Sequence, residues 1–154
     1  MAKIRHIAIA TEDPEATAQF YQDVFGLERI GDLQSEEVDG IYLSDGDLNV
    51  AFLRFKAGAI RDEMDRGDAP PRGLHHIGFL VENTDVVRRK LQDRGAPARN
   101  QRPLNANMFF EEKFTAAGDV IVDISEHPWL GVAPLAAAQS ADDAERAAAN
   151  VKRA

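Results

Sequence analysis

Two stretches of the chain share one alternation of apolar and polar positions. Residues 4–13 (IRHIAIATED) are echoed by residues 74–83 (LHHIGFLVEN), seventy positions later, and each carries a histidine at the matching place, His6 and His76. Side chains of a strand point alternately to its two faces, so each histidine shares a face with the small residue two positions on. The pattern predicts two buried strands built alike.

Helix signals follow each of these strands. In the first copy Asp13 is a good N-cap, Pro14 suits the first helical turn, and Gly26 suits the end, which predicts a helix over residues 14–25. The second copy predicts a cap near residues 83–84, a helix over residues 85–94 and a stop at the next glycine.

Three further strands are predicted after each helix, so each half has the order β-α-β-β-β. The first half has runs at residues 27–32, 39–44 and 48–55, with an Asp-Gly turn before the last; the second has runs near 98–102, 108–115 and 119–125. The fold class is therefore predicted to be α+β, with two paired βαβββ modules. The predicted divisions are the modules 1–55 and 73–129, a crossover 56–72, and an alanine-rich tail 130–154.

The last strands of the two halves differ at one informative position. Residues 46–52 align with residues 118–124, which places Ala51 opposite Asp123. A carboxylate in so apolar a strand needs a partner, because burying it alone costs several kcal/mol. A divalent cation held by His6, His76 and Asp123 would satisfy that need and leave coordination positions open. The alternatives are that the histidines are hydrogen-bonded core residues, and that Asp123 pairs with an arginine or caps a backbone turn.

Other polar and aromatic residues are candidates for the same site. The same alignment matches Tyr42 with Phe114, which predicts two pocket-wall residues, and alternation places His75 on the face opposite His76. Substrate contacts are predicted for Tyr42, Asn49, Asn107 and Phe114, with a turn as the alternative for Asn107. The candidate acid–base residues are Glu111, Glu112 and His127, and one of the two adjacent glutamates should face inward.

Composition narrows the functional classes. The chain has no cysteine, which excludes disulfides, thiolate ligands and a cysteine nucleophile, and favours a cytoplasmic location. Its net charge of −8 disfavours a nucleic acid or an anionic membrane as partner. No apolar run approaches the roughly 20 residues of a membrane span. We therefore expect a small-molecule substrate.

The chain resembles the vicinal oxygen chelate superfamily, which includes glyoxalase I, methylmalonyl-CoA epimerases, extradiol ring-cleaving dioxygenases and bleomycin or fosfomycin resistance proteins. The resemblance covers roughly residues 4–129. The resemblance rests on four segments, namely residues 6–9, residues 20–27 (FYQDVFGL), residues 75–83 and residues 120–127 (VIVDISEH). It implies eight strands in a mixed sheet that curls around a central metal, with ligands from the first and last strands of each module. It also implies a homodimer.

The resemblance implies three functions, in order of preference. Glyoxalases and epimerases usually place Glu or Gln on the fourth strand, where this chain has Ala51, so two histidines and one carboxylate remain, as in the Fe(II) site of extradiol dioxygenases. The leading hypothesis is a dioxygenase that chelates a small substrate through vicinal oxygens on Fe(II), with Mn, Zn, Ni or Co as other metals. The alternatives are a glyoxalase- or epimerase-like enzyme, with Glu111 or Glu112 as base, and a non-catalytic bleomycin-resistance-type binding protein.

Overall fold

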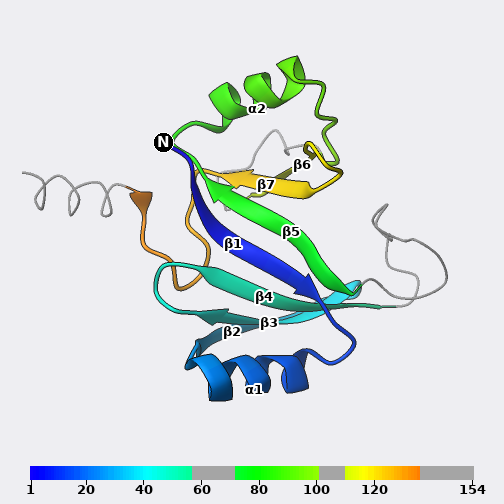
Figure 1. The fold of residues 1–154 in the computed structure, drawn as a ribbon, viewed down its shortest axis with the longest axis vertical. Helices are drawn as coiled ribbons and strands as arrows, with labels where there is room; N and C mark the ends of the chain where they lie inside the picture. The colour runs from blue at the N-terminus through cyan, green and yellow to red at the C-terminus, as the bar shows by residue number, and fades with distance from the viewer. Residues whose placement is uncertain (57–71, 101–109, 136–154) are drawn as a thin grey trace, which may run out of the picture.

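The computed structural model describes residues 1–56, 72–100 and 110–135, and these form one curled sheet with a helix at each end (Figure 1). The described part of the chain has two helices and seven strands. In chain order they are β1 (Lys3–Ala10), α1 (Pro14–Phe25), β2 (Glu28–Gln34), β3 (Val38–Ser44), β4 (Asn49–Phe55), β5 (Gly73–Leu80), α2 (Thr84–Asp93), β6 (Glu112–Thr115) and β7 (Ile121–Ser125).

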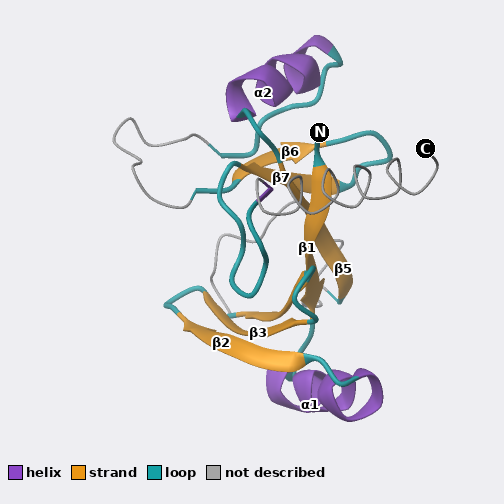
Figure 2. Cartoon of the chain, turned by 90° about the vertical axis from the view of Figure 1, so that its left-hand side faces the viewer, coloured by secondary structure: helices purple, strands orange, loops and turns teal. Residues whose placement is uncertain are grey.

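The two halves of the chain meet at the centre of the sheet. The strand order is β2-β3-β4-β1-β5-β7-β6, with β1 and β5 antiparallel to each other. Each of these central strands also pairs in parallel with the last strand of its own half, β1 with β4 and β5 with β7. The sheet bends so that its two ends curve towards each other (Figure 2). Any site at the β1–β5 seam therefore receives side chains from both halves.

Both helices begin where their local signals predicted. Asp13 accepts a hydrogen bond from the Ala16 amide at 3.0 Å, and α1 ends at Gly26, whose φ of 71° is left-handed. In the second half the Asn83 side chain accepts from the Val86 amide at 2.9 Å. No helix in the three described ranges is long and apolar enough to cross a membrane.

The second half departs from the prediction in its outer strands. Of the strand expected near residues 98–102, the described residues 98–100 make a single bridge, between Ala98 and Phe114. Of the strand expected over residues 108–115, the described part forms β6 from Glu112 onwards. The sheet therefore has seven strands in the described ranges, where eight were expected. Asn107 and most of the predicted crossover and tail lie outside the described residues.

Each helix covers its own apolar cluster on the outer side of the sheet. Ala18 of α1 packs with Ile41, Leu43, Val50 and Phe52. Under α2 the cluster consists of Val81, Phe114, Val122 and Ile124. Phe114 is thus a core residue here, where the sequence suggested a pocket wall.

The strand registers show how the repeat works. In the first half Ala51 lies beside Ala8, and in the second Asp123 lies beside Gly78, two residues after each histidine. This confirms that Ala51 and Asp123 occupy matching positions.

The match between Tyr42 and Phe114 is wrong by one residue. Tyr42 pairs with Ala51, and its counterpart, which pairs with Asp123, is Lys113. The connection 116–120 before β7 is one residue longer than the connection 45–48 before β4. A slip of one residue moves every side chain of a strand to its other face. Lys113 therefore takes the place that Phe114 was expected to fill.

Candidate active site

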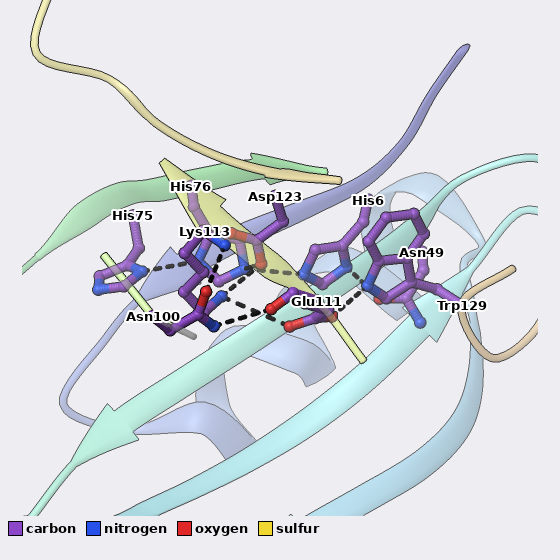
Figure 3. Close-up of polar contacts among 9 residues, drawn as sticks. All are labelled: His6, Asn49, His75, His76, Asn100, Glu111, Lys113, Asp123 and Trp129. Carbon is purple, nitrogen blue, oxygen red and sulfur yellow. Dashed lines mark hydrogen bonds and ion pairs between the residues drawn. The ribbon is translucent and has the colours of Figure 1, made fainter. Parts of the chain in front are cut away.

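A cleft of about 1650 Å³ lies between the two halves and holds most of the predicted site residues. Its apolar wall comes from the first half, chiefly Leu33, Val38, Leu53 and Phe55. Polar side chains from both halves also line the cleft, and most of those that form the site are drawn in Figure 3. They include His6, Tyr42, Asn49, His75, His76, Asn100, Glu111, Lys113 and His127.

The two repeated histidines meet at the seam between β1 and β5. Their Nε2 atoms are 3.1 Å apart, and both rings are buried. Burial lowers the pKa of each imidazole, so both are neutral near pH 7. Neutral imidazoles with facing Nε2 atoms are a suitable donor pair for a divalent cation.

His6 is held in place on two sides. Its Nδ1 lies 2.7 Å from Asn49 Oδ1, which can only accept, so Nδ1 carries the proton and Nε2 presents its lone pair to the site. The Asn49 amide nitrogen donates to the Leu130 carbonyl at 3.0 Å. Trp129 stacks on the His6 ring, with centroids 5.1 Å apart and planes 2° from parallel. Gly78 leaves room for this stack, since a Cβ there would lie 2.7 Å from both His6 Cβ and the Trp129 ring.

His75 is on the cleft side with His76, which corrects the expectation from simple alternation. The register of β5 against β1 runs from His76 opposite Ala8 to Leu74 opposite Ile9, so His75 is an extra residue in a β-bulge. A bulge breaks the alternation of faces, and both histidines line the cleft. Their Nδ1 atoms are 2.7 Å apart, and the His75 ring stacks on Phe55.

Asp123 is completely buried beside His76. Its Oδ2 lies 3.3 Å from His76 Nε2 and also contacts the Lys113 ammonium group. Its Oδ1 has no hydrogen-bond partner among the described residues. Burial, with the nearby Glu111 carboxylate, raises the pKa of Asp123 to about 7, although Lys113 acts in the opposite direction.

Glu111, immediately before β6, is the second carboxylate of the site. It accepts from Trp129 Nε1, and its Oε2 lies 3.4 Å from Lys113 Nζ. Burial opposes its ionisation, but Lys113, His6 and Trp129 together outweigh burial and hold the pKa of Glu111 below its usual range. Ligand atoms of His76, Glu111 and Asp123 all lie within 4.8 Å of one another.

These residues suit a divalent metal ion. The cluster offers neutral imidazole nitrogens and carboxylate oxygens, and Asp123 Oδ1 is a buried acceptor that no described donor satisfies. Nitrogen and carboxylate donors of this kind bind Fe(II), Mn, Co, Ni or Zn, and the set alone does not select among them.

Of the other predicted residues, some reach the cleft and some do not. Tyr42, Asn49 and His127 line it. Glu112 points to the other face of β6, where Arg88 donates to both of its carboxylate oxygens at 2.6 Å. Phe114 lies in the core under α2.

Lys113 and Trp129 were missed by the sequence reasoning. Lys113 could have been found by testing the alignment for a longer turn before the last strand. Trp129, the only tryptophan in the chain, follows the last strand and has no counterpart in the repeat that would signal its role.

Solved structures of similar fold include three bacterial proteins. A hypothetical protein from Bacillus halodurans has a TM-score of 0.67 at 19% identity, and the match covers 83% of this chain and 96% of that protein. Methylmalonyl-CoA epimerase of Streptomyces coelicolor has a TM-score of 0.63 at 22% identity, and the match covers 80% of this chain and 95% of the epimerase. The methylmalonyl-CoA epimerase of Mycobacterium tuberculosis has a TM-score of 0.64 at 19% identity, and the match covers 88% of this chain and 91% of that epimerase.

Two relatives and a family model match the sequence itself. The protein YwkD of Bacillus subtilis is 28% identical over 116 residues, 75% of this chain and 87% of that protein. An ethylmalonyl-CoA/methylmalonyl-CoA epimerase of Cereibacter sphaeroides is 29% identical over 101 residues, 62% of this chain and 73% of that protein. The family model matches residues 5–110. The chain therefore belongs to the Glyoxalase/Bleomycin resistance protein/Dioxygenase superfamily.

Proposed function

We propose that this protein is a metal-dependent isomerase of the epimerase type, which moves a proton at a carbon next to a carbonyl group. The observation that carries the proposal is Glu111, a half-buried carboxylate that lines the cleft and lies within 4.8 Å of the ligand atoms of His76 and Asp123. Of the two glutamates considered as bases from the sequence, only Glu111 lines the cleft. The epimerase relative from Cereibacter sphaeroides supports the same reaction class.

The proposed ligands are His6, His76 and Asp123. A divalent ion bound there would act as a Lewis acid that stabilises negative charge on the substrate's carbonyl oxygen. Asn49 keeps the lone pair of His6 Nε2 directed to the site. Trp129 and Lys113 fix the Glu111 carboxylate, whose lowered pKa keeps it ionised and able to accept a proton.

The proposed substrate class is a short acyl thioester with an acidic α-hydrogen. The cleft volume of about 1650 Å³ suits a ligand larger than the acyl group alone, and its first-half wall is apolar. The polar cluster at the seam would face the reacting end.

The test is α-proton exchange in D2O, followed by NMR, on methylmalonyl-CoA and ethylmalonyl-CoA with chelator-treated protein reloaded with Mn, Co, Zn or Fe(II). We expect metal-dependent exchange that Glu111→Gln reduces by about 10²-fold or more. The matched control is Glu112→Gln, the neighbouring glutamate on the other face, which should keep the wild-type rate. Equal rates in wild type and Glu111→Gln would refute Glu111 as the base.

A ring-cleaving dioxygenase is a second candidate, and the bulge at His75 favours it. Such enzymes usually carry a further acid–base histidine near the metal, and the bulge brings His75 to the cleft. Burial lowers the pKa of His75 to about 4, so its imidazole is a neutral proton acceptor. Oxygen uptake with a panel of catechols, after anaerobic Fe(II) loading, separates this reaction from proton exchange. Binding of substrates without turnover in either assay would support the non-catalytic alternative.

We also propose a homodimer, as the resemblance implied. Sedimentation of the purified protein measures this directly.

A further inference from the structure

In the part of the chain that the structure describes, Lys113 is the one cationic side chain that forms ion pairs with Asp123 and Glu111, the carboxylates of the proposed metal centre (Figure 3). Its ammonium group contacts Asp123 Oδ2 and lies 3.4 Å from Glu111 Oε2. It comes from β6, where it pairs directly across from Asp123 on β7. Only 26% of its side chain is exposed, so water screens this contact weakly.

The internal repeat shows that the lysine accompanies the carboxylate. At the matching positions of the first half, Tyr42 stands across from Ala51, a pair without charge. The second half has Lys113 across from Asp123. Asp123 would be costly to bury in ionised form without a cation, and Lys113 supplies one within the chain.

We propose that Lys113 is the built-in cation of this site, which offsets negative charge on Asp123 and Glu111 in the metal-free protein and which a divalent ion must displace from Asp123 Oδ2. The inference rests on the proposed metal centre. Lys113 occupies Asp123 Oδ2, the oxygen that lies 3.3 Å from His76 Nε2, so a metal ion held by His76 and this oxygen would compete with the ammonium group for it, and the two positive charges would repel each other. Lys113 therefore weakens metal binding and stabilises the metal-free fold.

The test measures Mn²⁺ affinity of chelator-treated protein by the paramagnetic resonance signal of free Mn²⁺. Emission of Trp129 gives a second readout, because this single tryptophan stacks on His6. The variants are Lys113→Met, which keeps the length of the side chain without its charge, and Lys113→Arg, which keeps the charge. Lys90→Met removes the same charge from the exposed surface of α2 and serves as the control.

We expect Lys113→Met to bind Mn²⁺ about tenfold or more tightly than wild type. Its metal-free form should melt at a lower temperature, and Mn²⁺ should raise its melting temperature more than that of wild type. Lys113→Arg and Lys90→Met should stay within about twofold of wild-type affinity. Lys113→Gln provides the same comparison if the methionine variant does not fold.

Two failures are distinguishable. If wild type binds Mn²⁺ and neither Lys113→Met nor Lys113→Gln binds it more tightly, the role of Lys113 is wrong and the metal centre stands. If no form of the protein binds Mn²⁺, Zn²⁺ or Fe(II), the metal centre itself is wrong, and the role of Lys113 fails with it.

Discussion

The two site histidines are oriented by different neighbours. Asn49 Oδ1 accepts from His6 Nδ1, and His75 Nδ1 lies against His76 Nδ1. A metal on His76 Nε2 requires the proton of that ring on Nδ1, so His75 would accept it there and keep its own proton on Nε2. Partners that fix the orientation of metal-binding histidines usually change metal affinity by about 10- to 100-fold when removed.

Replacing Asn49 should therefore weaken metal binding at the proposed centre without removing a proposed ligand. We expect Asn49→Ala to lower Mn²⁺ affinity about tenfold, because His6 loses the acceptor that fixes its tautomer. Asn49→Asp still accepts a hydrogen bond from His6 and should lose less Mn²⁺ affinity than Asn49→Ala. His76→Ala removes a proposed ligand and should lose far more. Competition with a chelator of known affinity measures all three. Equal losses in Asn49→Ala and His76→Ala would mean that Asn49 is itself a ligand.

At the scale of single residues, a sequence reveals what a repeat or a local rule encodes. His6, His76 and Asp123 could be nominated because the repeat aligns the two histidines and sets the carboxylate apart. Lys113 and His75 could not be placed, since each depends on one extra residue: a longer turn before β7 and a bulge in β5. An insertion of one residue reverses faces and leaves no mark in the apolar pattern.

Among the elements, the helices were predicted to within about one residue, whereas the outer strands of the second half were not. Helix ends depend on capping side chains close in sequence, such as Asp13 and Asn83. The ends of an edge strand depend on its partner, and within the described residues β6 pairs with β7 over four residues and with Ala98 through a single bridge. Strand pairing of this kind is not encoded in the strand itself.

The short strand β6 is tied to α2 by an ion pair. Arg88 Nε and Nη2 donate to the two oxygens of Glu112, whose side chain is 7% exposed. Glu112→Gln should lower the free energy of unfolding by about 1–3 kcal/mol, because it removes the charge that Arg88 binds. Urea denaturation measures this, and proton exchange by the folded variant should match wild type. An unchanged unfolding midpoint would show that the pair adds nothing to stability.

For the whole molecule, the site depends on the seam between the halves. His6 and Asn49 come from the first half; His76, Glu111 and Asp123 come from the second. Residues 127–131, including Trp129 and Leu130, close the site from beyond the last strand. The repeat predicted a site shared by both halves, but it could not predict the closing segment, which belongs to one half only.

Because so many titratable groups are buried at this seam, the stability of the metal-free protein should depend on pH in two opposing ways. Burial lowers the pKa of His6, His75 and His76 from 6.5, that of His75 to about 4. As the pH falls below 6.5, the unfolded chain therefore takes up histidine protons before the folded protein does. The free energy of unfolding falls as a result. Asp123 acts in the opposite direction, because its pKa is raised from 3.8 to about 7 and the folded protein holds this proton more tightly than the unfolded chain. Its contribution to the free energy of unfolding is therefore lost as the pH rises from about 3.8 to about 7.

Between about pH 5 and 6.5 the three histidine terms outweigh the single opposing Asp123 term, so the free energy of unfolding should rise over that range and level off towards about pH 8, where all four groups have released their protons in both states. Urea unfolding of chelator-treated protein at these three pH values measures the profile. Asp123→Asn should make the rise below about pH 7 steeper, because the histidines are unchanged and the opposing loss of the Asp123 proton is removed. A metal-free protein that grows more stable as the pH falls from about 6.5 to 5 would contradict the burial of neutral imidazoles at the seam.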